Sequence, residues 1–153
     1  MGQHPISTAK DISFVKLLMR ANSDAVGFIP VQGIERAATK GCLIIQRKEG
    51  ERVGYLLYGP INPNEDVHIW QECIDKDVRR LGCGQEAFFE LLRKAIDGGA
   101  KGIRLRCADE LPSTFFWKAL GFKLIRTETP KNRRKRKVNV FYMSLEQSPS
   151  IKQ

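Results

Sequence analysis

A short run of residues ahead of a strongly helical segment has the composition of an anion site. Gly82 and Gly84 stand where an expected strand gives way to an expected helix, and Arg79 and Arg80 precede them. Glycines let the backbone approach a ligand closely, and the free N–H groups of a first helical turn favour a phosphate. The run is not a Walker loop, and Ala87 stands where a dinucleotide-binding G-x-G-x-x-G has its third glycine. The sequence therefore predicts a phosphate site at this junction, with a tight helix entry as the alternative.

A carboxylate in the strand expected before this junction could move a proton. Alternation along the strand places Glu72 on the same face as His68 and Trp70. Burying Glu72 is costly unless it is paired or useful, and burial would raise its pKa toward the range in which it can accept a proton. The alternative is an ion pair with Arg104 or Arg106 on an adjacent strand. His68 is the second choice as a base.

The elements that must position these groups follow from hydrophobic periodicity. Thr8 followed by Asp11 resembles a capping box, and Gly50 supplies the turn of a hairpin. We expect helices over residues 8–22, 33–40, 85–97 and 113–120, and strands over residues 42–46, 53–58, 67–74, 103–105, 121–125 and 138–143. This order predicts an α/β (α+β mixed) fold with one mixed sheet of six to seven strands, flanked by about four helices, and one βαβ crossover.

Composition indicates one folded domain. The chain has 153 residues, of which 42% are hydrophobic and 28% charged, so it can bury a core. We expect the domain to cover residues 1–146, with residues 147–153 as a disordered tail. No apolar run approaches the roughly 20 residues that span a bilayer, and the N-terminus lacks a secretory signal, so we expect a soluble, cytoplasmic protein.

The four cysteines lack C-x-x-C spacing, and only two histidines accompany them. We therefore expect no zinc or other metal site and no disulfide framework. A role as small apolar packing residues is predicted for Cys42, Cys73, Cys83 and Cys107.

The positive charge is concentrated in one segment. The chain has 26 Lys and Arg against 17 Asp and Glu, and six of the seven residues 131–137 are basic. Without these six, 20 basic residues stand against 17 acidic ones. The segment is typical of a solvated loop that meets an anionic partner such as nucleic acid, and a solubility feature is the alternative. Its basic residues are Lys131, Arg133, Arg134, Lys135, Arg136 and Lys137.

The spacing Arg79-x-x-Gly82-x-Gly84 resembles the R/Q-x-x-G-x-G/A pyrophosphate loop of the GCN5-related N-acetyltransferase (GNAT) superfamily. The strand end before it, Ile74-Asp75, resembles the Val-Asp strand end of that family. Further along, the stretch Pro-Ser-Thr-Phe-Phe-Trp-Lys-Ala-Leu-Gly-Phe is similar to the family's A-x-x-F-Y-x-x-L-G-F.

This resemblance covers roughly residues 67–125 and implies the GNAT fold with acetyl-CoA as co-substrate. It implies that the backbone from Cys73 to Asp75 pairs with the pantetheine arm, and that the amides from Arg80 to Gln85 hold the pyrophosphate. The co-substrate-binding residues that it implies are Cys73, Ile74, Asp75, Arg79, Arg80, Leu81, Gly82, Cys83, Gly84, Gln85 and Trp117.

The family's usual proton donor is a Tyr four residues before the Gly of Leu-Gly-Phe, and Trp117 stands in that place here. An indole N–H donates a hydrogen bond but does not give its proton to a thiolate, whereas a Tyr hydroxyl, with a pKa of about 10, can. Tyr142, Ser113, Thr114 or water could substitute, and the indole would pack against the pantetheine or in the core. The predicted catalytic residues are Glu72, Tyr142 and Trp117.

The resemblance predicts an acyltransferase that moves the acetyl group of acetyl-CoA to an amine. That reaction needs a base for the amine, stabilisation of an oxyanion and protonation of the leaving thiolate. Two alternatives stay open. One is a nucleic-acid-directed acyl-group transferase that uses residues 131–137, and the other is an inactive protein that binds CoA or nucleic acid. A homodimer is also left open, and no membrane partner is expected.

Overall fold

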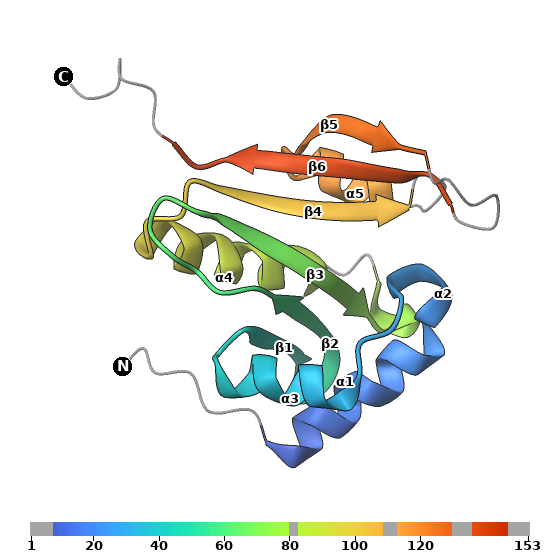
Figure 1. Ribbon diagram of the computed structural model, residues 1–153. Helices are drawn as coiled ribbons and strands as arrows, with labels where there is room; N and C mark the ends of the chain where they lie inside the picture. The colour runs from blue at the N-terminus through green and yellow to red at the C-terminus, as the bar shows by residue number, and fades with distance from the viewer. Residues whose placement is uncertain (1–7, 80–82, 109–112, 130–135, 147–153) are drawn as a thin grey trace. The chain divides into compact units, whose positions relative to one another are not determined.

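A computed structural model describes residues 8–79, 83–108, 113–129 and 136–146. In chain order (Figure 1) its elements are α1 (Ala9–Ala21), α2 (Ser23–Val26), α3 (Val31–Thr39), β1 (Leu43–Lys48), β2 (Glu51–Tyr58), β3 (Asp66–Ile74), the 3₁₀ turn η1 (Lys76–Val78), α4 (Cys83–Asp97), β4 (Gly102–Ala108), α5 (Ser113–Ala119), β5 (Lys123–Glu128) and β6 (Val138–Ser144). The mixed α/β fold class expected from the sequence is confirmed. Among the elements described, the periodicity did not predict α2, a single turn, or the 3₁₀ turn η1.

Contacts within the chain group it into two compact units. The first comprises Met1–Pro60 and Ile69–Leu91, and the second comprises Ile61–His68 and Leu92–Gln153. The expected single domain over residues 1–146 stays a prediction. The expected tail over residues 147–153 lies outside the described residues.

The first unit contains an antiparallel ladder in which β2 pairs with β1 and with β3. The β1–β2 hairpin turns at two residues with positive φ, Glu49 (53°) and Gly50 (82°). Two such residues are the requirement of a type I′ turn, whose twist matches that of the strands. The hairpin expected at Gly50 is therefore confirmed. In the separate pairing of β2 with β3, Leu56 lies opposite Glu72.

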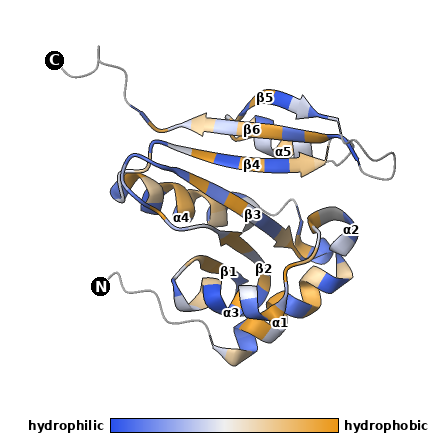
Figure 2. Ribbon diagram, viewed as in Figure 1, coloured by the Kyte–Doolittle hydropathy of each residue, from blue (hydrophilic) through white to orange (hydrophobic). Residues whose placement is uncertain are grey.

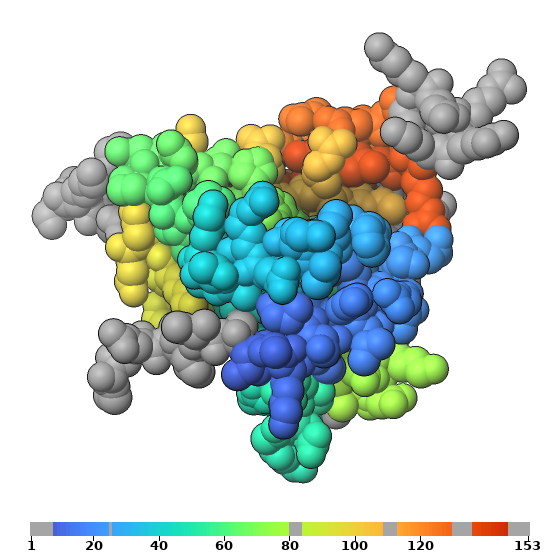
Figure 3. All heavy atoms as spheres, turned by 60° about the horizontal axis from the view of Figure 1, so that its bottom comes forward, coloured from blue at the N-terminus to red at the C-terminus, as the bar shows by residue number. Residues whose placement is uncertain are grey.

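Helices α1 and α3 contact each other and β2, and together they bury the core of the first unit. Figure 3 shows them side by side, α1 in blue and α3 in cyan. Val15 and Met19 from α1 and Ile34 from α3 are almost fully buried, as are Tyr55 and Leu56 on β2. Their spacing on each helix is the 3.6-residue periodicity that predicted it.

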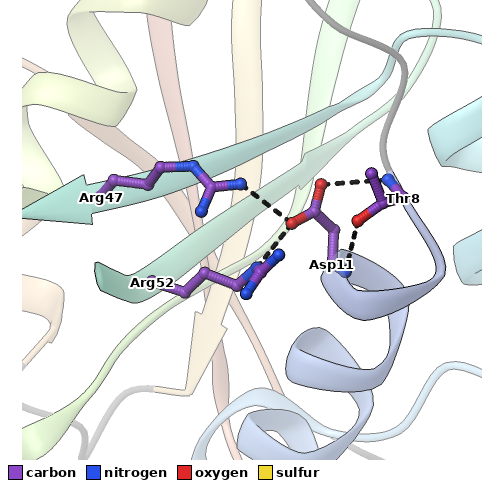
Figure 4. A network of polar contacts seen from close by, with 4 residues as sticks. All are labelled: Thr8, Asp11, Arg47 and Arg52. Atoms are coloured by element: carbon purple, nitrogen blue, oxygen red, sulfur yellow. Dashed lines mark hydrogen bonds and ion pairs between the residues drawn. The ribbon is translucent and has the colours of Figure 1, made fainter. Parts of the chain in front are cut away.

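The N-terminus of α1 is fixed by a network around Asp11 (Figure 4). The side chains of Thr8 and Asp11 each accept a hydrogen bond from the other's backbone N–H, which confirms the expected capping box. Asp11 Oδ1 also accepts from Arg47 at 3.0 Å and from Arg52 at 2.6 Å, both on the hairpin. Burial alone would raise the pKa of Asp11, but the bonds from Arg52 and Thr8 and the charges of both arginines hold it below its ordinary value.

The second unit contains an antiparallel ladder in which β6 pairs with β4 and with β5, and α5 contacts β4. We expected the strand that follows α5 over residues 121–125, whereas β5 is Lys123–Glu128. The first part of that range belongs to the helix end. Phe122 N–H donates to Trp117 O, Gly121 N–H donates to Lys118 O, and Gly121 has a φ of 106°. This Schellman cap delays the strand by two residues.

The described cysteines, Cys42, Cys73 and Cys107, are free and buried, which agrees with packing roles. The side chain of Cys83 lies outside the described residues.

Within the described part of the chain, no group of His, Cys, Asp and Glu is arranged to hold a metal ion. None of the helices described here has the length and apolar character needed to cross a membrane.

Candidate functional site

Strand β3 alternates between buried and more exposed residues. Figure 2 shows hydrophobic and hydrophilic stretches along the same strand. His68 and Trp70 are exposed, and Glu72, on the same face, is half-buried. Its Oε2 is shielded from solvent and has no hydrogen-bond partner among the described residues. Burial raises the pKa of Glu72 well above the ordinary value for a carboxyl group. A shielded, unpaired carboxylate of this kind is typical of a functional group.

The two arginines that could have neutralised Glu72 bind other carboxylates in the second unit. Arg104 lies 3.5 Å from Asp66 Oδ2, and Arg106 forms an ion pair with Glu128. Glu72 itself belongs to the first unit, so its ion pair with either arginine stays an alternative prediction.

Gln71, the other polar residue that interrupts the apolar pattern of β3, is buried on the opposite face. Its Oε1 accepts a hydrogen bond from the Tyr55 hydroxyl at 2.9 Å, and its Nε2 donates to Val26 O at 2.8 Å. One amide thus satisfies two groups and ties β3 to the end of α2. This role explains why a polar residue stands in the core.

The turn between β3 and α4 is held by its own polar groups. Asp75 N–H donates to Val53 O at 2.7 Å, and the Asp75 carboxylate accepts from Asp77 N–H at 3.0 Å. Arg79 donates from Nε to Ile74 O and from its guanidinium to Asn22 Oδ1, both at 2.9 Å. Arg79 therefore fastens the turn to the end of β3 and to Asn22, the C-cap of α1.

Helix α4 begins at Cys83, two residues before the expected start, and runs for 15 residues. Such a helix presents unpaired N–H groups and the positive end of its dipole at its first turn. In that turn Gln85 is exposed and Gly84 is half-buried. The predicted phosphate-binding residues Arg80, Leu81 and Gly82 lie outside the described residues.

Cys73 lies next to Glu72 on β3 and is buried. Burial raises the pKa of its thiol to about 11, although the nearby Arg79 guanidinium partly opposes this. The thiol is thus neutral at physiological pH and suits a packing role or backbone contact rather than nucleophilic attack.

Gly54 lets β2 approach the end of β3 closely, opposite Ile74. A Cβ at this position would lie 2.8 Å from Cys73 O and 2.3 Å from Ile74 Cδ1. We expect Gly54→Ala to lower the free energy of unfolding by about 1–3 kcal/mol, because backbone atoms must move. Urea denaturation measures this.

The control for Gly54→Ala is Gly33→Ala in α3, where a Cβ meets only the side-chain methyl of Ile29, at 2.9 Å. This change is expected to be neutral or to stabilise by up to about 1 kcal/mol, because alanine favours helix. Equal losses in the two variants would contradict the close approach of β2 to β3.

In the second unit Trp117 is buried in an aromatic cluster of α5. Its ring packs edge-on against Phe116 and Phe122, with centroid separations of 4.8 and 5.4 Å. These contacts are those of a core residue, and the predicted contact of the indole with the pantetheine stays a prediction.

Tyr142 on β6 lies opposite Arg104, near the beginning of β4. Its hydroxyl donates to Asp66 Oδ1 at 3.1 Å, and the Arg104 guanidinium lies 5.5 Å from the ring centroid. Burial and the hydrogen bond to Asp66 raise the pKa of Tyr142. Asp66 is a residue that no sequence motif indicated.

The other donors considered, Ser113 and Thr114, lie toward the opposite end of β4. Ser113 Oγ is 3.0 Å from Cys107 Sγ, and Thr114 Oγ1 is 3.5 Å from Ala108 O. The structure therefore separates Tyr142 from these hydroxyls, which stand beside the start of α5.

Residues 13–122 match the sequence model of the acetyltransferase (GNAT) family. The match spans most of the chain and includes the strand, turn and helix just described. The protein therefore belongs to this family of N-acetyltransferases. No curated protein matches the chain.

Several solved structures share this fold. Ard1 from Thermoplasma volcanium is 15% identical with a TM-score of 0.79, over 94% of this chain and 97% of that one. An aminoglycoside 6'-N-acetyltransferase complexed with coenzyme A is 12% identical with a TM-score of 0.77, over 93% and 94%. The ribosomal-protein-S18-alanine N-acetyltransferase from Escherichia coli is 11% identical with a TM-score of 0.73, over 94% of both chains.

Proposed function

We propose that this protein transfers the acetyl group of acetyl-CoA to an amine, with Glu72 as the general base. The observation that carries the proposal is the shielded, unpaired Glu72 carboxylate on the strand that leads into the turn before α4. Family membership supports acyl transfer, and the CoA complexes among similar structures support acyl-CoA as the co-substrate.

The start of α4 fits the phosphates of CoA, because a 15-residue helix offers amides and a positive dipole there. We infer that the backbone from Cys73 to Asp75 meets the pantetheine arm. Arg79 already donates to Ile74 O and Asn22, so it acts by positioning the turn. The other proposed contacts come from Arg80, Leu81, Gly82, Cys83, Gly84 and Gln85, and from Trp117 at the pantetheine.

Glu72 accepts the proton of the acceptor's ammonium, which frees the amine for attack on the thioester carbonyl. The raised pKa of Glu72 makes it a stronger base than an ordinary carboxylate.

The departing thiolate has an unperturbed pKa of about 8.5, so water can protonate it near neutral pH. Tyr142 stays a predicted acid, but its contact with Asp66 and its raised pKa favour water in this role. The predicted cytoplasmic location and the homodimer also stay predictions.

Acetyl-CoA at about 100 times its dissociation constant is expected to stabilise the protein by about 2.7 kcal/mol. For a chain of this size that raises Tm by about 5–10 °C in a thermal-shift assay. Acetyl-pantetheine, which lacks the nucleotide and its phosphates, is the matched control and is expected to give a much smaller shift. The absence of any shift with acetyl-CoA would exclude the proposed function.

A further inference from the structure

The second unit has one sheet face that is rich in cations. In an antiparallel ladder, residues directly opposite one another lie on the same face. Tyr142 on β6 lies opposite Arg104 on one side and Lys123 on the other. The next position on this face carries a second pair of cations. We call this surface the cationic face, and it comprises Arg104 and Arg106 on β4 and Lys123 and Arg126 on β5.

The second pair is arranged like the first, because Val140 lies opposite both Arg106 and Arg126. The bulge in β5 between Leu124 and Arg126 keeps Lys123 and Arg126 on the same face. Neighbouring strands are about 4.8 Å apart and alternate residues on a strand about 6.8 Å apart. The four cations therefore form a regular grid of about 7 by 10 Å.

These side chains reach solvent. The exposed fraction of the side chain is 59% for Arg106 and 50% for Arg126, and Lys123 is also exposed. Figure 2 shows hydrophilic stretches on both β4 and β5. No hydrogen bond or ion pair joins the Lys123 side chain to the residues that the structure describes, whereas Arg104, 30% exposed, lies 3.5 Å from Asp66 Oδ2. The face is thus open to a ligand.

A single carboxylate pairs with both arginines of the second row, which leaves this row with a net charge of +1. Glu128 binds Arg106 through Oε1 and Arg126 through Oε2, the latter at 2.9 Å. The hydrogen bond from Arg126 and the charges of both arginines lower the pKa of Glu128. Exposed ion pairs contribute little free energy, so a phosphate can replace this carboxylate.

The strands that border the cationic face are joined in the sequence by the basic segment. Glu128 at the end of β5 pairs with Val138 at the start of β6, and residues 129–137 connect them along the chain. The face and the segment together hold ten of the 26 Lys and Arg, and Asp66 and Glu128 are the acidic partners of the face. Without these residues the chain has 16 basic and 15 acidic residues, so most of the excess of positive charge comes from these two parts of the sequence.

We propose that the cationic face binds single-stranded nucleic acid through its phosphate backbone. A regular grid of cations fits a polyanion whose charges repeat regularly, and the guanidinium fork bonds two phosphate oxygens at once. An acidic peptide would need pockets for its side chains as well as charge. The proposal does not rest on acyl transfer, because the four cations take no part in the proposed reaction. Tyr142, a predicted acid, lies between Arg104 and Lys123, but it is not altered in the test.

The test uses a labelled oligothymidylate of about 20 nucleotides and fluorescence anisotropy over a salt series. The double variant Arg106→Gln/Arg126→Gln is expected to bind about tenfold or more weakly. Its slope of log K against log salt should fall by about 1.4, because each lost phosphate contact removes about 0.7. Glu128→Gln frees both arginines and is expected to bind about three- to tenfold more tightly.

The matched control is Lys10→Gln/Lys16→Gln, which removes the same charge from exposed positions of α1. Its affinity is expected to stay within about twofold of the unaltered protein. An equal loss in this control, no binding by the unaltered protein, or tighter binding of poly-glutamate than of the oligonucleotide would overturn the proposal. The acetyl-CoA thermal shift should be unchanged in all these variants, so failure here is distinct from failure of the proposed function.

Discussion

Glu72→Gln is expected to lower kcat for acetyl transfer to an amine by about 10²- to 10⁴-fold. The amide keeps the shape of the side chain but cannot accept a proton at neutral pH. Acetyl-CoA should still produce its thermal shift, because the proposed phosphate contacts lie beyond the end of β3. Thioester consumption with a panel of amines measures the rate. Glu35→Gln, the same change at an exposed site on α3, is the control and should leave kcat unaltered.

The pH dependence of kcat separates a base from a structural carboxylate. Burial raises the pKa of Glu72, so the active, ionised form appears only as the pH rises through that raised value. The rate of the unaltered protein should therefore increase across this range, and Glu72→Gln should lose this limb of the profile. An unchanged rate or an unchanged profile in the variant would reject Glu72 as the base.

The free energy of unfolding of Glu72→Gln is a control for folding, because the substitution is expected to lower the rate but to raise the stability. Between the ordinary carboxyl pKa and the raised one, the native state holds more protons than the unfolded state. Stability therefore falls as the pH rises through this window, by up to about 1.4 kcal/mol for each pKa unit of the shift. The glutamine variant avoids this loss, so it should be more stable than the unaltered protein at neutral pH, as urea denaturation can measure.

Asp11→Ala is expected to lower the free energy of unfolding by about 2–4 kcal/mol. Loss of the cap accounts for about 1 kcal/mol, and loss of a buried acceptor for two arginines accounts for the rest. The arginines are partly exposed, with exposed side-chain fractions of 44% for Arg47 and 28% for Arg52, so the loss is below that of a fully buried pair. Denaturation in urea at pH 7 measures the change.

A double-mutant cycle isolates the pair from the cap. Arg52→Ala should cost more than Arg47→Ala, because Arg52 is the more buried and lies 2.6 Å from Asp11. If Arg52→Ala cost the same in the presence and absence of Asp11, the ion pair would contribute nothing.

The pKa of Asp11 is lowered in the folded state, so the contribution of Asp11 to stability is present above the ordinary carboxyl pKa and disappears as the pH falls through the lowered value. Asp11→Ala should weaken this acid sensitivity.

Local signals in the sequence predicted the elements well. The capping box at Thr8 and the hairpin at Gly50 depend on residues within a few positions of each other, and both are present. The predicted start of β5 was two residues too early, because Gly121 and Phe122 form the C-terminal cap of the preceding helix. Hydrophobic periodicity alone does not show that these two residues belong to the cap rather than to the strand.

The candidate site was less predictable because its contacts join distant parts of the sequence. The phosphate role that the motif assigns to Arg79 stays a prediction, and no motif indicated that Arg79 also donates to Asn22, 57 positions earlier. Tyr142 was considered as an acid from its residue type, whereas its hydroxyl bonds to Asp66, 76 positions away. Such pairs depend on strand register, which a single sequence specifies only through packing.

The amide of Gln71 restricts what this position tolerates. Glutamate would still accept from Tyr55, but it would set a negative charge against the carbonyl of Val26. Leucine would leave a hydroxyl and a carbonyl stranded in apolar surroundings. The position needs a side chain of this length that both donates and accepts a hydrogen bond. Glutamine is almost the only amino acid that meets these requirements, so we expect few substitutions to be tolerated here.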